Sequence, residues 1–171
     1  IRVEFEGQAI EGRYLLLDNQ RYQGKVGYLA IQLTQNKTGE WVLIERGFIA
    51  APTSRDELPS VDWLSGEVKG KGRLYGRSTN PLSKDLYMEE GTPSRIQNLN
   101  FEQLETHWQV ELQRYVIQPQ LADWPYPQPW QPISMSPDKH VGYAVQWFSM
   151  AAVLVLLCCG LIYRMLRLKA Y

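Results

Sequence analysis

A histidine stands at the start of a long apolar segment, with aromatic and small residues behind it at helical spacing. His140 is followed by Tyr143, Ala144, Trp147 and Ala151. Residues at these offsets share one face of a helix. Histidine is a common axial ligand of haem iron, and flat rings with small side chains between them would let a porphyrin approach the helix. This face predicts a haem site in which His140 supplies the iron ligand from this chain, and another helix or protein supplies the second.

A structural interpretation of the same histidine stays open. Together with Lys139 it could anchor the end of a membrane helix among lipid headgroups, because polar side chains with apolar bodies favour that interface. The second histidine of the chain, His107, follows a predicted helix start and precedes Trp108. We expect it to be a surface or half-buried helix residue without a ligand.

Arg46 is the other candidate for binding, because it lies in the otherwise apolar stretch WVLIERGFI, residues 41–49. A charge in such a strand needs a partner. Asp18 could provide it, or a haem propionate could. The simpler interpretation is an arginine paired within its own domain.

Residues typical of enzyme active sites are not present in a usable arrangement. The sequence has no Gly-x-Ser-x-Gly motif and no pair of histidines at metal-ligand spacing, and Cys158 and Cys159 are adjacent inside the apolar segment. The glycines of residues 70–76 do not have the spacing of a dinucleotide-binding loop. The sequence favours a binding or assembly protein over an enzyme.

The apolar segment is predicted to cross a membrane. Residues 141–163 contain no charged side chain. A helix of that length is about 34 Å long, and a hydrocarbon core is about 30 Å thick. We therefore expect a span over 140–163. Arg164, Arg167 and Lys169 follow it, which places the tail, 164–171, on the cytoplasmic side, or on the matrix side in a mitochondrion.

The residues before the span are predicted to form one external domain, 1–118, and its composition limits its partners. Lys and Arg number 18 and Asp and Glu number 18, interspersed along the chain, so nucleic acid is not an expected partner. The chain begins at Ile1, inside an alternating pattern and without a methionine. We expect a further segment before it.

Strand patterns dominate this domain. Alternation, or a high density of β-branched and aromatic residues, predicts strands at 1–6, 13–18, 26–33, 41–49, 67–75, 86–89 and 110–117. Gly7 is expected to end the first strand, and residues 36–39 to form a tight hairpin. Asn100 is expected to cap a short helix, with Gln103 at the capping-box position. The connections are too short for parallel crossovers, which predicts a mainly β (α+β) fold, an antiparallel β-rich barrel or sandwich with one or two short helices.

Between the domain and the span lies a proline-rich segment, residues 119–139, which holds six of the ten prolines of the chain. Prolines at this density favour an extended conformation. Trp124, Tyr126 and Trp130 are interleaved with them, and amphipathic rings suit a strap that lies on the domain or at a membrane interface. We call residues 119–139 the strap.

Several stretches resemble the surfeit locus protein 1 family, the cytochrome c oxidase assembly factors of bacterial and mitochondrial inner membranes. They are LLLDNQRYQGKVGYLAIQL (15–33), WVLIERGFIAAP (41–52), RIQNLNFEQLE (95–105) and KHVGYAVQWFSMAA (139–152). The most specific pieces are Leu-Asp-Asn-Gln at 17–20, the Arg-Gly pair at 46–47 with its neighbours, and the His-x-x-Tyr-Ala-x-x-Trp pattern that begins at His140.

The resemblance implies a role in oxidase maturation, with delivery or insertion of haem a as the task and a histidine, here His140, as the haem ligand. It implies the catalytic subunit of cytochrome c oxidase and membrane lipid as partners, and a second, N-terminal transmembrane helix before the external domain. The expected location is the bacterial inner membrane, with the mitochondrial inner membrane as the alternative. A scaffold that binds the nascent oxidase subunit and never binds haem is the competing function.

Overall fold

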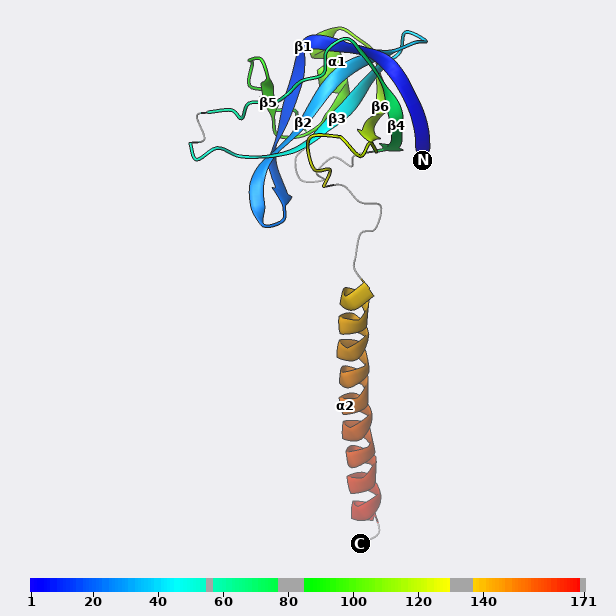
Figure 1. Ribbon diagram of the computed structural model, residues 1–171. Coiled ribbons are helices and arrows are strands. Elements are labelled where there is room, and N and C mark those ends of the chain that lie inside the picture. Colours follow the sequence, from blue (N-terminus) through cyan, green and yellow to red (C-terminus); the bar gives the residue numbers. More distant parts are fainter. Residues whose placement is uncertain (55–56, 77–84, 130–136, 170–171) are drawn as a thin grey trace. The chain divides into compact units, whose positions relative to one another are not determined.

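In the computed structural model the chain forms a β-rich unit, Ile1–Pro129, and a second unit, Trp130–Tyr171, that contains one long helix (Figure 1). The structure describes residues 1–54, 57–76, 85–129 and 137–169. Trp130 and Pro132 of the predicted strap and the last two residues of the tail lie outside this part. The described elements are β1 (Arg2–Tyr22), β2 (Lys25–Asn36), β3 (Trp41–Ala50), β4 (Glu67–Tyr75), β5 (Ser94–Ile96), α1 (Phe101–Trp108), β6 (Leu112–Pro119) and α2 (Pro137–Lys169).

Strand β1 does not end at Gly7, and that prediction is wrong. Gly7 pairs with Val68 of β4 and also with Asn36 of β2, so β1 changes its partner there. A Cβ atom at Gly7 would lie 2.5 Å from the carbonyl oxygen of Gln35. The glycine therefore permits a close approach of two strands and does not interrupt the sheet. The register with β2 shifts again between Ala9 and Tyr14.

Five strands close on themselves. β1 pairs with β2, β2 with β3, β3 with β6, β6 with β4, and β4 with the first half of β1. Figure 1 shows β1 curving across the unit to complete this circuit. The predicted mainly β class is confirmed, and the strands form a barrel with β5 added beside β1.

The sheet is mixed and not wholly antiparallel, which corrects the predicted pairing. β3 and β6 are parallel, as are β1 and β5. The chain between β3 and β6 contains β4, β5 and α1, which is long enough for a crossover. The strand predicted at 86–89 is also wrong, because within the described residues this stretch makes only an isolated bridge between Glu89 and Arg95.

Other local predictions are confirmed. Asn100 caps α1, with its side-chain oxygen accepting a hydrogen bond from the backbone N–H of Gln103 at 3.0 Å. Leu104 and Trp108 of this helix are buried. The hairpin between β2 and β3 is closed by Asn36, whose carbonyl accepts from the N–H of Gly39 at 3.0 Å. The helix cap and the hairpin turn both depend on hydrogen bonds between residues a few positions apart, so the sequence alone predicts them.

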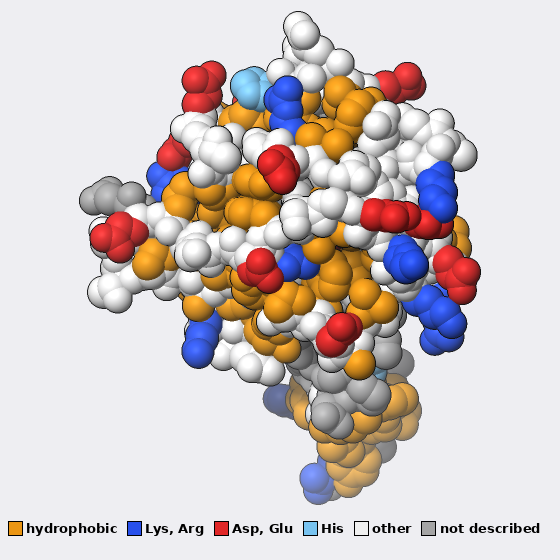
Figure 2. All heavy atoms as spheres, turned by 45° about the horizontal axis from the view of Figure 1, so that its top comes forward, with side chains coloured by type: hydrophobic (Ala, Val, Ile, Leu, Met, Phe, Trp, Pro, Cys, Tyr) orange, Lys and Arg blue, Asp and Glu red, His pale blue; other side chains and the backbone are white. Residues whose placement is uncertain are grey.

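Helix α2 contains the predicted span. The stretch His140–Leu168 is long and apolar enough to cross a membrane. At about 1.5 Å for each residue it exceeds a hydrocarbon core of about 30 Å. Figure 2 shows hydrophobic side chains gathered on this helix, whereas acidic and basic side chains are interspersed on the visible face of the β unit.

Candidate functional site

The predicted haem-binding face lies on α2. His140 is exposed, and within the described residues it makes no hydrogen bond or ion pair, so its imidazole is available to a ligand. Tyr143 is 55% exposed and Trp147 is 68% exposed. Helical spacing brings their rings to the same side as His140, with Ala144 between them. The helix thus places the three residues predicted for haem on one face. An imidazole and flat rings are side chains that suit a porphyrin, and haem binding stays a prediction.

Arg46 lies elsewhere, in the β unit, where a β-bulge directs it. Ala30 of β2 pairs with Gly47, and Ile31 pairs with Glu45, which leaves Arg46 as the extra residue of β3. Gly47 has a φ of +125°, a conformation that side chains rarely adopt. The bulge turns Arg46 inward, and its side chain is only 3% exposed.

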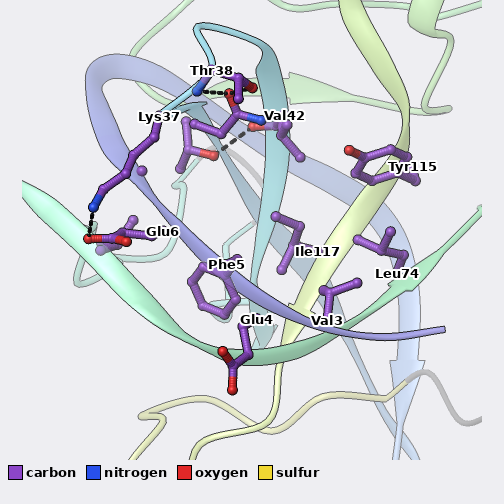
Figure 3. Close-up of a pocket in the computed structure, with 14 residues that line it drawn as sticks. Val3, Glu4, Phe5, Glu6, Lys37, Thr38, Val42, Leu74, Tyr115 and Ile117 are labelled. Atoms are coloured by element: carbon purple, nitrogen blue, oxygen red, sulfur yellow. Dashed lines mark hydrogen bonds and ion pairs between the residues drawn. The ribbon is translucent and has the colours of Figure 1, made fainter.

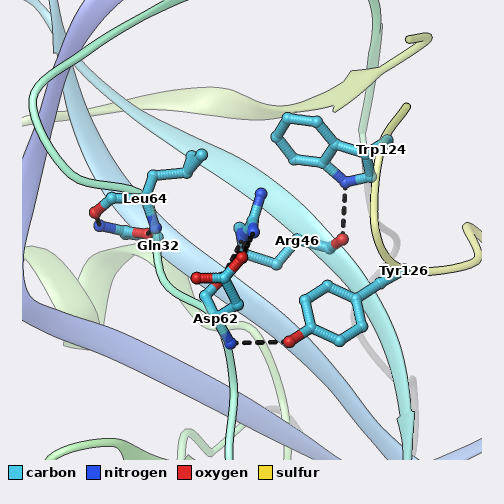
Figure 4. Close-up of polar contacts among 6 residues, drawn as sticks. All are labelled: Gln32, Arg46, Asp62, Leu64, Trp124 and Tyr126. Atoms are coloured by element: carbon cyan, nitrogen blue, oxygen red, sulfur yellow. Dashed lines mark hydrogen bonds and ion pairs between the residues drawn. The ribbon is translucent and has the colours of Figure 1, made fainter. Parts of the chain in front are cut away.

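The guanidinium of Arg46 is already bound within the β unit (Figure 4). Its Nε and Nη2 donate to the backbone carbonyl of Asp62 at 2.9 and 2.5 Å. It lies 4.5 Å from the ring centre of Trp124 and 5.6 Å from that of Tyr126. Burial lowers the pKa of Arg46, and the charge of Asp62 opposes this shift. The partner suggested from sequence, Asp18, is not its partner, because the loop that carries Asp62 occupies that place.

The first part of the strap is fixed to β3 by the same cluster. The indole Nε1 of Trp124 donates to the carbonyl of Arg46 at 2.7 Å, and the N–H of Phe48 donates to the carbonyl of Pro127 at 2.7 Å. The hydroxyl of Tyr126 accepts from the N–H of Asp62 at 2.7 Å. The rings of Trp124 and Tyr126 therefore pack on the domain, one of the two places that the sequence allowed for the rings of the strap.

Asp18 has a different task at a second bulge. Asp18 and Asn19 together oppose Tyr28, because Leu17 pairs with Leu29 and Gln20 with Gly27. Asn19 has a φ of +57°, and its side chain donates to Gln97 Oε1 at 2.8 Å. Gln97 donates in turn to Asp18 Oδ2 at 3.2 Å. This bulge holds the loop before α1 against the end of β1.

A comparison with known protein families decides the assignment. The model of the SURF1 family matches residues 1–152, which includes both bulges and the start of α2 with His140 and Trp147. The chain belongs to the SURF1 family. This is a family of cytochrome oxidase assembly factors, and it is not a family of catalytic enzymes. No individual curated protein matches the chain.

In this SURF1-family chain, each of the two motifs of the β unit forms a β-bulge and so has a structural role. The Leu-Asp-Asn-Gln motif forms the bulge at Asp18 and Asn19, and the Arg-Gly motif forms the bulge at Arg46 and Gly47. Asn19 of the first motif is exposed but bonded to Gln97, and Arg46 of the second is buried and bonded to Asp62. The residues of the motif that begins at His140 are exposed along α2, and this motif stays the candidate site. His107 is an exposed residue of the last turn of α1, as expected.

Sequence reasoning missed a buried polar cluster around Glu45. This carboxylate is fully buried, and it accepts hydrogen bonds from the hydroxyl of Tyr75 and from Gln118 Nε2. Gln118 Oε1 accepts from Arg73 Nε at 2.6 Å. The adjacent charges of Glu45 and Arg46 in an otherwise apolar stretch were a signal, because two buried charges that neighbour each other need separate partners.

Proposed function

We propose that this chain is a membrane-anchored assembly factor that binds haem a through the His140 face of α2 and helps its insertion into the catalytic subunit of cytochrome c oxidase. The observation that carries the proposal is the exposed imidazole of His140, which has no partner among the residues that the structure describes and lies in line with two exposed rings on an apolar helix. The family-model match includes this segment.

The residues of this face have distinct roles. A nitrogen of His140 would ligate the haem iron, while the rings of Tyr143 and Trp147 would contact the macrocycle. Ala144 and Ala151 leave room for a flat group to lie close to the helix. A bound haem a supplies the redox-active iron that the oxidase needs. One ligand from this chain holds the cofactor less firmly than two, which suits a protein that passes it on.

Arg46 does not belong to this site in our proposal. Its guanidinium is buried and its Nε and Nη2 both donate to the carbonyl of Asp62. A haem propionate would have to displace Asp62 and both rings of the strap to reach it. We assign Arg46 to holding the strap on the β unit.

The proposed location follows from α2 and the residues after it. The helix would span the inner membrane, with Arg164 and Arg167 on the inner side. The β unit would then face the periplasm of a bacterium, or the intermembrane side in a mitochondrion. The catalytic subunit and membrane lipid would be the partners of this arrangement.

An absorbance spectrum tests the proposal. The full chain is purified from cells that make haem a, both as the parent and as His140→Ala. We expect a Soret band in the parent and its loss in the variant, at equal protein level, because alanine removes the iron ligand and preserves the helix.

His107→Ala is the matched control, since it also replaces an exposed helical histidine by alanine. It should keep the Soret band of the parent. Equal haem content in His140→Ala and the parent would remove the haem proposal and favour the scaffold function, in which the chain binds the oxidase subunit only.

A further inference from the structure

A cavity opens at one end of the barrel. Its volume is about 280 Å³, and every barrel strand contributes to its wall (Figure 3). Phe5 lies on β1, Thr34 on β2, Val42 on β3, Leu74 on β4 and Ile117 on β6. All residues that line it belong to the β unit. It lies where the first half of β1 closes against β4.

The wall of this cavity is mostly apolar and incompletely covered. Val3, Phe5, Val68 and Leu74 line it and are only half-buried. Figure 3 shows Val3, Phe5, Leu74 and Ile117 gathered around one space. Apolar side chains that remain half-buried around a space leave apolar surface in contact with water. An apolar occupant would remove that surface from water, which is the usual basis of ligand binding in such cavities.

The charges at the mouth are paired with one another. Lys37 Nζ lies 2.5 Å from Glu6 Oε1, across the gap between the β2–β3 hairpin and β1. Glu4 lies 4.0 Å from Lys71. A charged ligand would have to break the close pair between Lys37 and Glu6, so the mouth favours a neutral molecule.

One polar group of the wall is available to a ligand. The hydroxyl of Tyr115 has no hydrogen-bond partner within the described residues, and the ring is half-buried. Burial raises the pKa of Tyr115, and the carboxylate of Glu40 adds to this shift. A tyrosine hydroxyl is protonated at neutral pH even at its ordinary pKa, and it is therefore able to donate a hydrogen bond.

We propose that this cavity binds the end of a neutral hydrocarbon tail of a membrane-soluble molecule, with the hydroxyl of Tyr115 donating to an oxygen of that molecule. At about 30 Å³ for each water-sized group, the space holds roughly nine or ten carbon atoms of a chain. The tail is either isoprenoid or an unbranched acyl chain. A protein with an apolar, exposed helix such as α2 meets both in a membrane. The proposal stands whether or not His140 binds haem.

Photolabelling of the full chain in phosphatidylcholine nanodiscs tests this site. The probe is farnesol that carries a diazirine, and adducts are mapped by mass spectrometry. We expect adducts on β1, β4 and β6. Labelling of α2 shows independently that the probe has entered the bilayer. Excess farnesol or excess 1-decanol then competes with the probe, and the better competitor identifies the tail as isoprenoid or unbranched.

The same change, valine to phenylalanine, is made at one position inside the cavity and at one position outside it. Val68→Phe fills the cavity and should reduce labelling of the three strands about tenfold. Val26→Phe, at an exposed position outside the cavity, should leave it unchanged. If thermal melting shows that Val68→Phe does not fold, Val3→Phe replaces it, because Val3 also lines the cavity.

Tyr115→Phe tests the hydrogen bond separately. Loss of one hydrogen bond should weaken competition by farnesol about fivefold. Adducts confined to α2, equal strand labelling in Val68→Phe and Val26→Phe, or labelling that neither alcohol displaces would each overturn the proposal.

Discussion

Arg46 carries a charge in the interior of the β unit, and stacking on aromatic rings stabilises the buried guanidinium. Its guanidinium lies beside the rings of Trp124 and Tyr126 and donates to the carbonyl of Asp62. Arg46→Ala should therefore lower the free energy of unfolding by about 2 to 3 kcal/mol, through lost packing and lost cation–π contact. Urea denaturation followed by tryptophan fluorescence measures this change.

Arg21→Ala is the control for Arg46, because Arg21 is an exposed arginine near the β1–β2 hairpin. It should change stability by less than about 0.5 kcal/mol. Arg46→Lys should recover only part of the loss, since an ammonium group keeps the charge but neither stacks like a planar guanidinium nor donates through two nitrogens. Full stability of Arg46→Ala would show that the strap does not depend on this residue.

The ion pair of Glu6 and Lys37 gives stability a pH dependence. The hydrogen bond from Lys37 lowers the pKa of Glu6 below its usual value of 4.5. The stabilisation is thus present above pH 4.5 and is lost as the pH falls through the lower pKa of the folded protein. Between pH 6 and pH 3 the urea midpoint of the parent should fall more than that of Glu6→Gln. Parallel pH curves for the two proteins would contradict this assignment.

At the residue scale, the sequence predicts the features that depend on interactions between residues close together in the chain. The cap at Asn100 and the turn at Asn36 were predictable, because each satisfies backbone groups within four residues. The need of Arg46 for a partner was predictable too. Its partner was not, since Asp62 arrives on a loop whose path no periodicity describes, and the burial of Glu45 depends on the same bulge.

Among the elements, the bulges of β1 and β3 are the features that shape the barrel. Gly47 allows the second of them, and a Cβ atom there would lie 2.7 Å from both the carbonyl oxygen of Pro127 and the Cβ of Tyr126. Gly47→Ala should lower the free energy of unfolding by more than about 2 kcal/mol, because backbone strain and a steric clash with the strap add together. Thermal and urea unfolding measure the loss.

Gly39→Ala isolates the backbone contribution. Gly39 also has a positive φ, +86°, but a Cβ atom there would meet nothing within 4 Å. It should lower stability by only about 1 kcal/mol. Equal losses at the two positions would show that the strap does not press on Gly47.

Element boundaries were predicted less well where pairing, and not composition, decides them. Glycine is a poor strand residue, which favoured an end of β1 at Gly7. The structure uses the missing side chain there to bring β1 close to β2. Leu86–Glu89 has a strand-like composition but, within the described residues, makes only the isolated bridge between Glu89 and Arg95.

For the whole molecule, the mixed sheet was beyond sequence reasoning. Hydrophobic alternation identifies β3 and β6 as strands, but it does not state that they are neighbours or that they run parallel. That pairing, like the pairing of β1 with both β2 and β4, depends on contacts between residues far apart in sequence. The apolar helix was predictable, since length and hydropathy alone define it.

The orientation of the chain in the membrane is the last prediction, and it depends on the basic residues at the end of α2. Arg164, Arg167 and Lys169 lie within the short window in which basic side chains retain a segment on the inner side. A green fluorescent reporter fused after Tyr171, active only inside the cell, should fluoresce, and alkaline phosphatase at the same position, active only outside, should be inactive. Replacing the three basic residues by glutamine should reduce fluorescence and raise phosphatase activity. The control replaces Lys69, Lys71 and Arg73 of β4 by glutamine. It should change neither signal, because these residues lie in the β unit, far from the helix in sequence. High phosphatase activity in the unsubstituted fusion would reverse the orientation, and with it the side of the membrane on which the β unit and the His140 end of the helix lie.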